Sequence, residues 1–285
     1  MAATSSPTVR RRQLAGELKR LRLAAKMTIE QVASTVDWSP GKLSRIENAR
    51  NSINLRDTRI LLKIYGVEGA EADALLEVAR RARERGWWQQ YGEAVPEWFQ
   101  TYVGLEAEAS SIARYQSDLI PGLLQTRDYA TAVHSAAALN ATAVDIERQV
   151  DVRMERQARL TDADAPELWV VLSEAVVRRL VGDREIMHDQ LSQLIESMAI
   201  PSITLQVLPF SAGAHPAMDS AFSIVTFNPP TPGDVVYLEY PTGALYLEDP
   251  DDVSRYRLMF NHLRALAMSP EDTRRLLVGV IQDLG

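Results

Sequence analysis

The stretch Thr28–Asn48, TIEQVASTVDWSPGKLSRIEN, predicts two short helices joined by a tight turn. Thr28 followed by Gln31 is the pattern of a capping box, in which each side chain bonds the backbone N–H of the other residue. Ser39 followed by Pro40 predicts the start of the second helix, because proline at the first helical position lacks an N–H that has no partner there anyway. The stretch is therefore a candidate helix-turn-helix.

The second of these helices has an apolar side and a polar side. Leu43 and Ile46 are expected to face inward. The outer side is slim and cationic, and it consists of Gly41, Lys42, Ser44 and Arg45. A helix N-terminus attracts phosphate, and an arginine can bind the O6/N7 edge of guanine with two hydrogen bonds. The pattern favours a helix that enters the DNA major groove over the alternative, an ordinary two-helix corner with a solvated face.

Charge is divided unevenly along the chain of 285 residues. The net charge is −7, but residues 1–63 carry +8 and the remainder carries −15. All four lysines, Lys19, Lys26, Lys42 and Lys63, lie in the first part. A basic head on an acidic body is expected when only the head meets phosphate. A hydrophobic content of 46% and this length allow two globular domains.

Several classes of protein are disfavoured by composition. There is no cysteine, which excludes disulfides, thiolate metal sites and a cysteine nucleophile. The N-terminus lacks the apolar core of a secretory signal, and no run approaches the ~18 apolar residues of a membrane span. A cytoplasmic protein without membrane contact is expected. Residues 1–8 are polar and are predicted to be a disordered tail.

Apolar residues at helical spacing surround the central pair of helices. A first helix is predicted over residues 9–26, with Leu14, Leu18, Leu21 and Ala25 inward and with Arg11, Arg12, Lys19, Arg22 and Lys26 on solvated faces. A fourth helix is expected to have Leu55, Ile60, Leu61 and Ile64 inward and to end at Tyr65, with Gly66 as its stop. A fifth is predicted over residues 71–85, so that residues 9–85 form a five-helix domain.

This segment resembles the XRE/Cro-repressor type of helix-turn-helix domain. The resemblance places the residues at Ser39, Pro40, Gly41, Lys42 and Arg45 at or near base edges, and those at Thr28, Asn48 and Arg50 near the DNA backbone. Ser44 shares the outer side of the same helix. Glu47 matches an acidic residue that is more often structural. Ala49 departs from the family, which usually has glycine there, and a less left-handed helix exit is expected.

Residues 86–104 are rich in aromatic side chains. Six of the 19 aromatic residues of the chain lie here, and Tyr102 is the last of them. Such a segment is too apolar for a flexible linker. A packed joint between head and body is expected. The alternative is an exposed platform for stacking bases, but positive charge is not interleaved with these aromatics.

Residues 105–285 predict an α+β body. Helices are expected over residues 105–117 and, after a turn at Pro121 and Gly122, through about Ala138. Further helices are expected over residues 143–160, 174–181, 184–199, 250–267 and 270–283. Strand-like runs are LWVVLS, ITLQVLPF, AFSIVTF, VVYLEY and ALYLED, the last two joined by a hairpin at Pro241-Thr242-Gly243. The predicted fold class is α+β, mainly α, with helices packed on a sheet of four or five strands.

The body is similar to the domain that follows the XRE head in the WhiJ-like, antitoxin-like transcriptional regulators of actinobacteria. The segments that carry this resemblance are IPGLLQTRDYA, VDVRMERQ, LSEAVVRRLVG and QVLPFSAGAHPAMDSAF. The resemblance implies DNA binding by the head and pairing with a small acidic protein encoded nearby. It implies no enzymatic activity and no cofactor.

Catalytic and metal chemistry find little support in the body. The four histidines, at positions 134, 188, 215 and 262, show no metal-ligand spacing, so no metal site is expected. A nucleophile and base could be assembled from Ser173, Glu174 and His215. The sequence does not favour this arrangement, because there is no GxSxG elbow and Ser173 suits a helix cap. No phosphate-binding glycine loop is present. The expectation is a protein that is not an enzyme.

One basic cluster in the body is a candidate partner site. Arg153, Arg156 and Gln157 share one face of the predicted helix 143–160. That face is solvated, or paired internally with carboxylates such as Glu174, or a receptor for an acidic partner.

The sequence as a whole predicts a DNA-binding regulator that acts as a homodimer on double-stranded DNA. The C-terminal domain is expected to bind a signal, a small partner protein or alternatively a small effector molecule.

Overall fold

The computed structural model describes residues 7–49, 51–137, 142–229 and 233–284. The chain divides into two compact units, and each is described by itself. The first contains the chain up to Gln89 together with Asn228 and Pro229, and the second contains residues 90–227 and 233–284. The first unit is helical and the second carries a sheet packed with helices, which confirms the mainly α, α+β fold class. Of the predicted N-terminal tail, residues 1–6 lie outside the described residues, whereas Pro7 and Thr8 begin the first helix.

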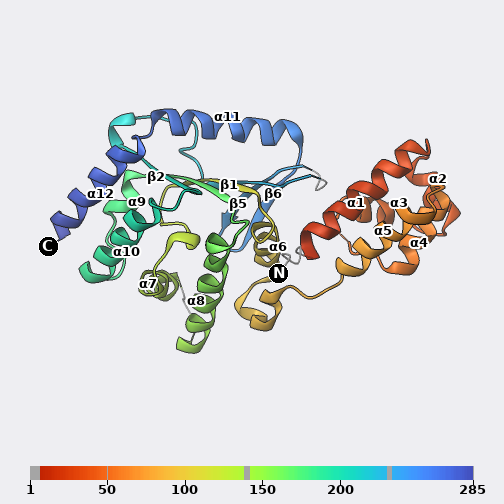
Figure 1. Cartoon of the computed structure of the whole chain (residues 1–285), viewed down its shortest axis with the longest axis horizontal. Coiled ribbons are helices and arrows are strands. Elements are labelled where there is room, and N and C mark those ends of the chain that lie inside the picture. The colour runs from red at the N-terminus through yellow and green to blue at the C-terminus, as the bar shows by residue number, and fades with distance from the viewer. Residues whose placement is uncertain (1–6, 50, 138–141, 230–232, 285) are drawn as a thin grey trace. The chain divides into compact units, whose positions relative to one another are not determined.

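Five helices form the head, as expected. They are α1 (Pro7–Ala24), α2 (Ile29–Thr35), α3 (Pro40–Glu47), α4 (Leu55–Ile64) and α5 (Gly69–Arg81) (Figure 1). Their buried side chains, among them Leu14, Leu18, Leu43 and Leu61, form one apolar core. Ile60 was expected in this core but is exposed, because Thr58 and Leu62 occupy the inner side of α4. Gly66 ends α4 at φ +74, a left-handed conformation that glycine adopts without strain.

The aromatic segment after α5 folds into a 3-10 stretch, η1 (Trp87–Ala94), and a helix, α6 (Glu97–Glu106). Tyr102 of α6 is completely buried and stacks on Tyr237, with ring centroids 4.1 Å apart. The Tyr246 hydroxyl donates a hydrogen bond of 2.7 Å to the Trp98 carbonyl. The second half of the segment therefore contributes to the core of the second unit.

The second unit is built on one six-stranded sheet. The strands are β1 (Ser111–Gln116), β2 (Glu167–Ser173), β3 (Ile203–Leu208), β4 (Phe222–Thr226), β5 (Val235–Tyr240) and β6 (Gly243–Leu247). Their order is β3-β2-β1-β4-β5-β6. Strand β2 pairs in parallel with β3 and with β1, where Tyr115 lies opposite Val171. The pairs β1–β4, β4–β5 and β5–β6 are antiparallel. The predicted hairpin at Pro241 joins β5 to β6.

The prediction of a helix over residues 105–117 is wrong. Helix α6 ends at Glu106, and residues 111–116 form β1 in the middle of the sheet. Backbone pairing on both sides, with β2 and β4, overrides the local preference of a short run that contains alanine, arginine and glutamine. This strand raises the number of strands from the predicted four or five to six.

Helices cover both faces of this sheet (Figure 1). The remaining helical segments are η2 (Gly122–Leu124), α7 (Arg127–Ala137), α8 (Ala143–Gln157), η3 (Ala158–Thr161), α9 (Glu174–Arg178), α10 (Arg184–Ser197), η4 (Phe210–Ala212), α11 (Pro250–Leu266) and α12 (Pro270–Leu284). Helix α11 runs across one face and contacts β1, β3, β4 and β5, while α7, α8, α9 and α10 lie on the other side. No helix in the described part of the chain is long and apolar enough to cross a membrane.

Candidate nucleic-acid interface

The two predicted helix starts of the helix-turn-helix are confirmed in atomic detail. The Thr28 hydroxyl accepts a hydrogen bond from the Gln31 backbone N–H at 3.2 Å, and the Gln31 side chain accepts one from the Thr28 N–H at 2.8 Å. The Ser39 hydroxyl accepts from the Lys42 N–H at 3.2 Å, and Pro40 is the first residue of α3. Both helices therefore begin where the capping residues dictate.

The turn between α2 and α3 is closed by local backbone bonds. Asp37 has φ +56, a left-handed conformation that aspartate tolerates better than most residues. The Trp38 N–H then donates to the Ala33 carbonyl at 2.9 Å, which satisfies a carbonyl at the end of α2. Together with the Ser39 cap, this turn fixes the direction in which α3 leaves α2.

A buried ion pair joins α3 to α1. The Arg22 Nε and Nη2 atoms donate to the two carboxylate oxygens of Glu47 at 2.8 and 2.9 Å, and Arg22 Nη1 donates to the Met27 carbonyl at 2.7 Å. The hydrogen bond with Glu47 raises the pKa of Arg22. The expectation that Arg22 lies on a solvated face is wrong, because its side chain is only 8% exposed. Glu47 has the structural role that the resemblance implied.

Lys42 lies on the outer side of α3 but is already in contact with two neighbours. Its Nζ atom is 3.4 Å from the Asp57 carboxylate in the first turn of α4, and it is 3.6 Å from the centre of the Trp38 ring. The Lys42 side chain is 39% exposed. Sequence reasoning missed both partners, since Asp57 lies on another helix and no periodic signal connects it to Lys42.

Arg45 is the exposed cation of α3 whose side chain has no ion pair or hydrogen bond with any other described residue. Its guanidinium lies beside Gly41, where a Cβ atom would be 3.4 Å from Arg45 Nη1. Gly41 therefore leaves room for the arginine along the outer side of the helix. Ser44 lies between these positions and is half-buried.

The end of α3 holds the last of the predicted contact residues. The Asn48 side chain donates to the Ser44 carbonyl at 2.8 Å and thereby caps the helix end. Arg50 lies outside the described residues. Ala49 has φ +55, so the expectation of a less left-handed exit is wrong: the chain takes the left-handed turn with alanine where the family usually has glycine.

Replacing Ala49 by glycine is expected to stabilise the head by about 0.5–1 kcal/mol. A left-handed conformation costs a residue with a Cβ atom about 1–2 kcal/mol, and the greater chain entropy of unfolded glycine offsets part of the gain. Urea unfolding of the full chain measures the difference. Ala74→Gly inside α5 is the matched control, and it should destabilise. An Ala49→Gly variant that loses stability as Ala74→Gly does would contradict the reasoning.

The residues considered for catalysis in the body have other partners. The Ser173 hydroxyl accepts from the Ala175 N–H and caps α9. The Glu174 carboxylate is 2.6 Å from Arg178 and also accepts from the Phe210 N–H at 2.8 Å. His215 lies 3.3 Å from the Tyr115 hydroxyl, and burial lowers its pKa. The described residues contain no group of acidic and histidine side chains that could hold a metal ion.

The basic cluster of α8 points into the body. The Arg156 guanidinium is buried and donates to both oxygens of Glu106, at 2.7 and 2.8 Å. The Arg153 side chain donates to Gln125, and Gln157 donates to the carbonyls of Gly122 and Gln125. Of the three alternatives for this face, internal pairing fits the geometry, with Glu106 in the place expected for Glu174. No local pattern predicts Glu106 as the partner of Arg156, because it lies on a different helix, α6.

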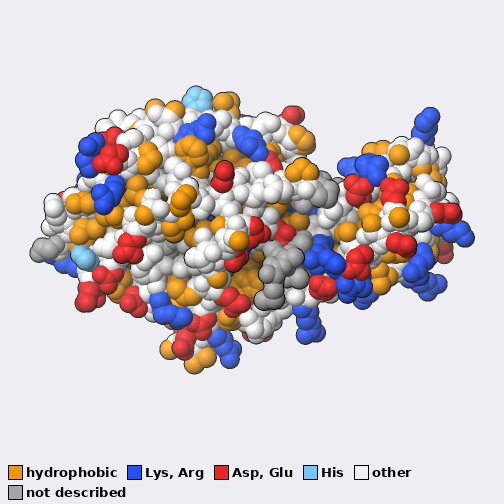
Figure 2. All heavy atoms as spheres, in the orientation of Figure 1, with side chains coloured by type: hydrophobic (Ala, Val, Ile, Leu, Met, Phe, Trp, Pro, Cys, Tyr) orange, Lys and Arg blue, Asp and Glu red, His pale blue; other side chains and the backbone are white. Residues whose placement is uncertain are grey.

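A capped, cationic helix on a compact helical head defines a helix-turn-helix DNA-binding domain of the XRE-like kind. Figure 2 shows Lys and Arg side chains gathered over the head on the face that it draws. Residues 13–75 match the family model of a helix-turn-helix domain, and the protein is a DNA-binding transcription regulator.

The body identifies the family. Residues 99–278 match the model described as a domain of unknown function (DUF5753). That match covers more than half of the chain, and the protein belongs to the DUF5753 family. No curated protein and no solved structure matches the chain.

Proposed function

We propose that this protein is a sequence-specific, cytoplasmic transcription regulator that binds double-stranded DNA as a homodimer and carries no catalytic activity. The observation that supports sequence-specific recognition is Arg45, an exposed arginine on the outer side of α3 whose side chain has no partner among the residues that the structure describes. An arginine that binds a guanine with two hydrogen bonds contributes about 1–3 kcal/mol of discrimination. A single head covers one half-site, so two copies on a symmetric site are expected.

The combined replacement Lys42→Ala and Arg45→Ala is expected to abolish the preference for the target sequence. The target is first obtained by selecting bound fragments from a random DNA pool with the full-length protein. Gel-shift titration then compares specific and unrelated DNA, and the specific affinity should fall at least tenfold. Arg148→Ala, an exposed arginine of α8, removes charge outside the head and should have no such effect. Sequence-specific binding by the double variant would contradict the assignment to α3.

Asp57→Asn is expected to raise the affinity for unrelated DNA severalfold. The carboxylate of Asp57 holds the ammonium group of Lys42 at 3.4 Å, so its removal frees a cation for phosphate. One more phosphate contact steepens the slope of log affinity against log salt by about 0.9. Titrations at several salt concentrations measure this slope.

The matched control makes the same Asp57→Asn change in a Lys42→Gln background. If Asp57 acts through Lys42, this second replacement changes the slope much less. An equal change in both backgrounds would show that Asp57 acts through its general field and not through Lys42.

The body is proposed to receive a regulatory signal. Sequence reasoning left two candidates, a small acidic partner protein, as in the WhiJ-like and antitoxin-like regulators, and a small effector molecule. Arg156 and Gln157, the residues considered for the protein partner, are bonded inside the body. A cavity beside α11, described below, favours the small molecule. Purification from the native host separates the two candidates, because a protein partner appears as a second band.

A further inference from the structure

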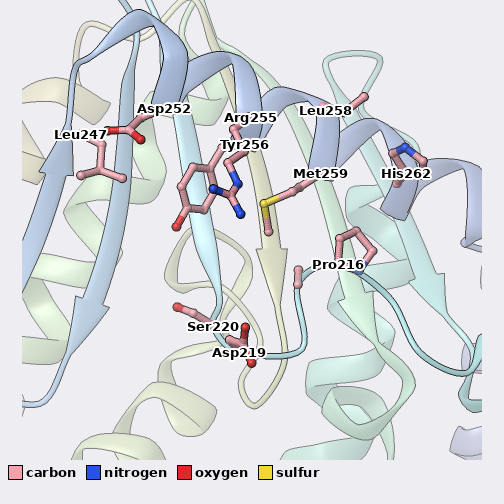
Figure 3. A pocket seen from close by; sticks show the side chains of 11 residues that line it. Pro216, Asp219, Ser220, Leu247, Asp252, Arg255, Tyr256, Leu258, Met259 and His262 are labelled. Atoms are coloured by element: carbon pink, nitrogen blue, oxygen red, sulfur yellow. The ribbon is translucent and has the colours of Figure 1, made fainter.

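A cavity of about 700 Å³ lies beside α11. We call it the α11 groove. One wall is α11 itself, and the other is the loop that carries Pro216 to Ser220, with Leu247 from the end of β6 at one side (Figure 3). Its volume is within the range of pockets that hold small organic ligands.

Much of the lining is apolar. Tyr256 and Met259 project from α11 into the groove, and Tyr256 packs edge-on against Phe222 of the core, with ring centroids 5.0 Å apart. Leu258 also lines the groove and is 59% exposed, a large apolar side chain without full cover. A methionine adapts its shape to different apolar molecules. This lining suits a ligand with an apolar body.

Arg255 gives the groove a charge preference. Its guanidinium points, with Tyr256 and Met259, toward the loop that carries Asp219 and Ser220 (Figure 3). Asp252 lies one turn earlier on α11, yet Arg255 forms no ion pair with it or with any other described residue. An exposed guanidinium beside an apolar cavity is suited to bind the carboxylate of a ligand with two hydrogen bonds.

Two acidic residues at the groove limit the charge that it accepts. Asp252 lies in the first turn of α11, where the helix dipole stabilises a carboxylate, and Asp219 belongs to the facing loop. Both repel negative charge on a ligand, so that the attraction of Arg255 can offset at most one such charge. The groove is therefore suited to one negative charge and disfavours phosphate groups.

We propose that the α11 groove binds an apolar organic acid with a single negative charge, and that this acid is the signal received by the body. The apolar lining holds its hydrocarbon part and Arg255 binds its acid group. The inference rests on the proposed regulatory role of the body, and it names the chemistry of the ligand.

The test uses two fluorescent probes that differ by one acid group. The first, 8-anilinonaphthalene-1-sulfonate, carries a single negative charge, and the second, N-phenyl-1-naphthylamine, has the same rings without the sulfonate. Each is titrated into the full-length protein without DNA. Arg255→Gln should weaken binding of the sulfonate about three- to tenfold and leave the neutral probe unchanged.

Two further variants keep the result interpretable. Arg274→Gln removes an exposed arginine of α12 and should change neither probe. Met259→Trp fills the groove and should weaken both. Equal effects of Arg255→Gln and Arg274→Gln, or binding of both probes that survives Met259→Trp, would overturn the site. Circular dichroism confirms that each variant is folded.

A second readout tests the signalling role. A saturating concentration of the sulfonate probe should change the DNA affinity of the unaltered protein and not that of Arg255→Gln. If the probe binds at Arg255 but the DNA affinity stays constant, the signalling role is overturned. If no DNA binding is detected at all, the failure belongs to the proposed function, because probe binding is measured independently.

Discussion

Glu106→Gln is expected to destabilise the body by about 3–5 kcal/mol, because it leaves the buried charge of Arg156 without its partner. Glu106 and Arg156 are only 3% and 5% exposed and are joined by two hydrogen bonds. A second guanidinium, that of Arg153, is close by, and burial together with Arg156 lowers the pKa of Arg153 to about 10. At neutral pH Glu106 is therefore the buried carboxylate that is hydrogen-bonded to Arg156, while the charge of Glu239 also attracts both guanidinium groups.

Urea unfolding followed by tryptophan fluorescence and circular dichroism measures this loss. The two units allow two transitions, so the probes are analysed separately. Glu147→Gln, at an exposed position of α8, is the control and should change the free energy of unfolding by less than about 0.5 kcal/mol. A Glu106→Gln variant as stable as the control would show that Arg156 finds compensation elsewhere.

Glu47→Gln is expected to destabilise the head by a similar amount, about 3–5 kcal/mol, and to weaken DNA binding with it. Its carboxylate and Arg22 are 2% and 8% exposed, and the pair fixes the outward helix α3 against α1. The expected result is a head that unfolds at lower urea concentration while the body keeps its own transition. Gel-shift titration with the selected DNA should show a parallel loss of affinity.

The double replacement Arg22→Met and Glu47→Leu separates charge burial from packing. Apolar residues of similar volume in place of a buried ion pair are often neutral or stabilising, so this variant should recover most of the stability. Glu68→Gln, an exposed residue before α5, is the control for the loss of one negative charge. A double variant as unstable as Glu47→Gln would mean that the geometry of the pair, and not its charge, holds the two helices together.

Local signals predicted the head well. The caps at Thr28 and Ser39, the apolar spacing of Leu14 and Leu18, and the stop at Gly66 act over a few residues, and the structure confirms each. In the body, the periodic helices and the hairpin after β5 were predicted for the same reason. Each of these features depends on residues that are close together in the sequence, so a short stretch is enough to predict it.

The features that sequence reasoning missed depend on distant residues. Residues 111–116 are a strand because β2 and β4 flank them, and no local pattern records those partners. The sequence predicts Arg22 and Lys42 as solvated or available cations and leaves internal pairing of Arg156 as one of three alternatives. In the structure each of the three meets a carboxylate on another helix. The charge of a residue is visible in the sequence, whereas its counter-ion is known only once the chain is folded.

The position of β1 in the sheet also determines how late in synthesis the body can complete its fold. Its partner residues on β4, with Ser111 opposite Thr226, are synthesised about 110 residues after β1 itself. At roughly 5–20 residues per second, translation leaves β1 with an unpaired edge for on the order of ten seconds. The head, whose apolar core is built from residues between Leu14 and Ala79, is complete long before that. Nascent chains therefore carry a finished DNA-binding domain ahead of a body that still awaits its central pairing.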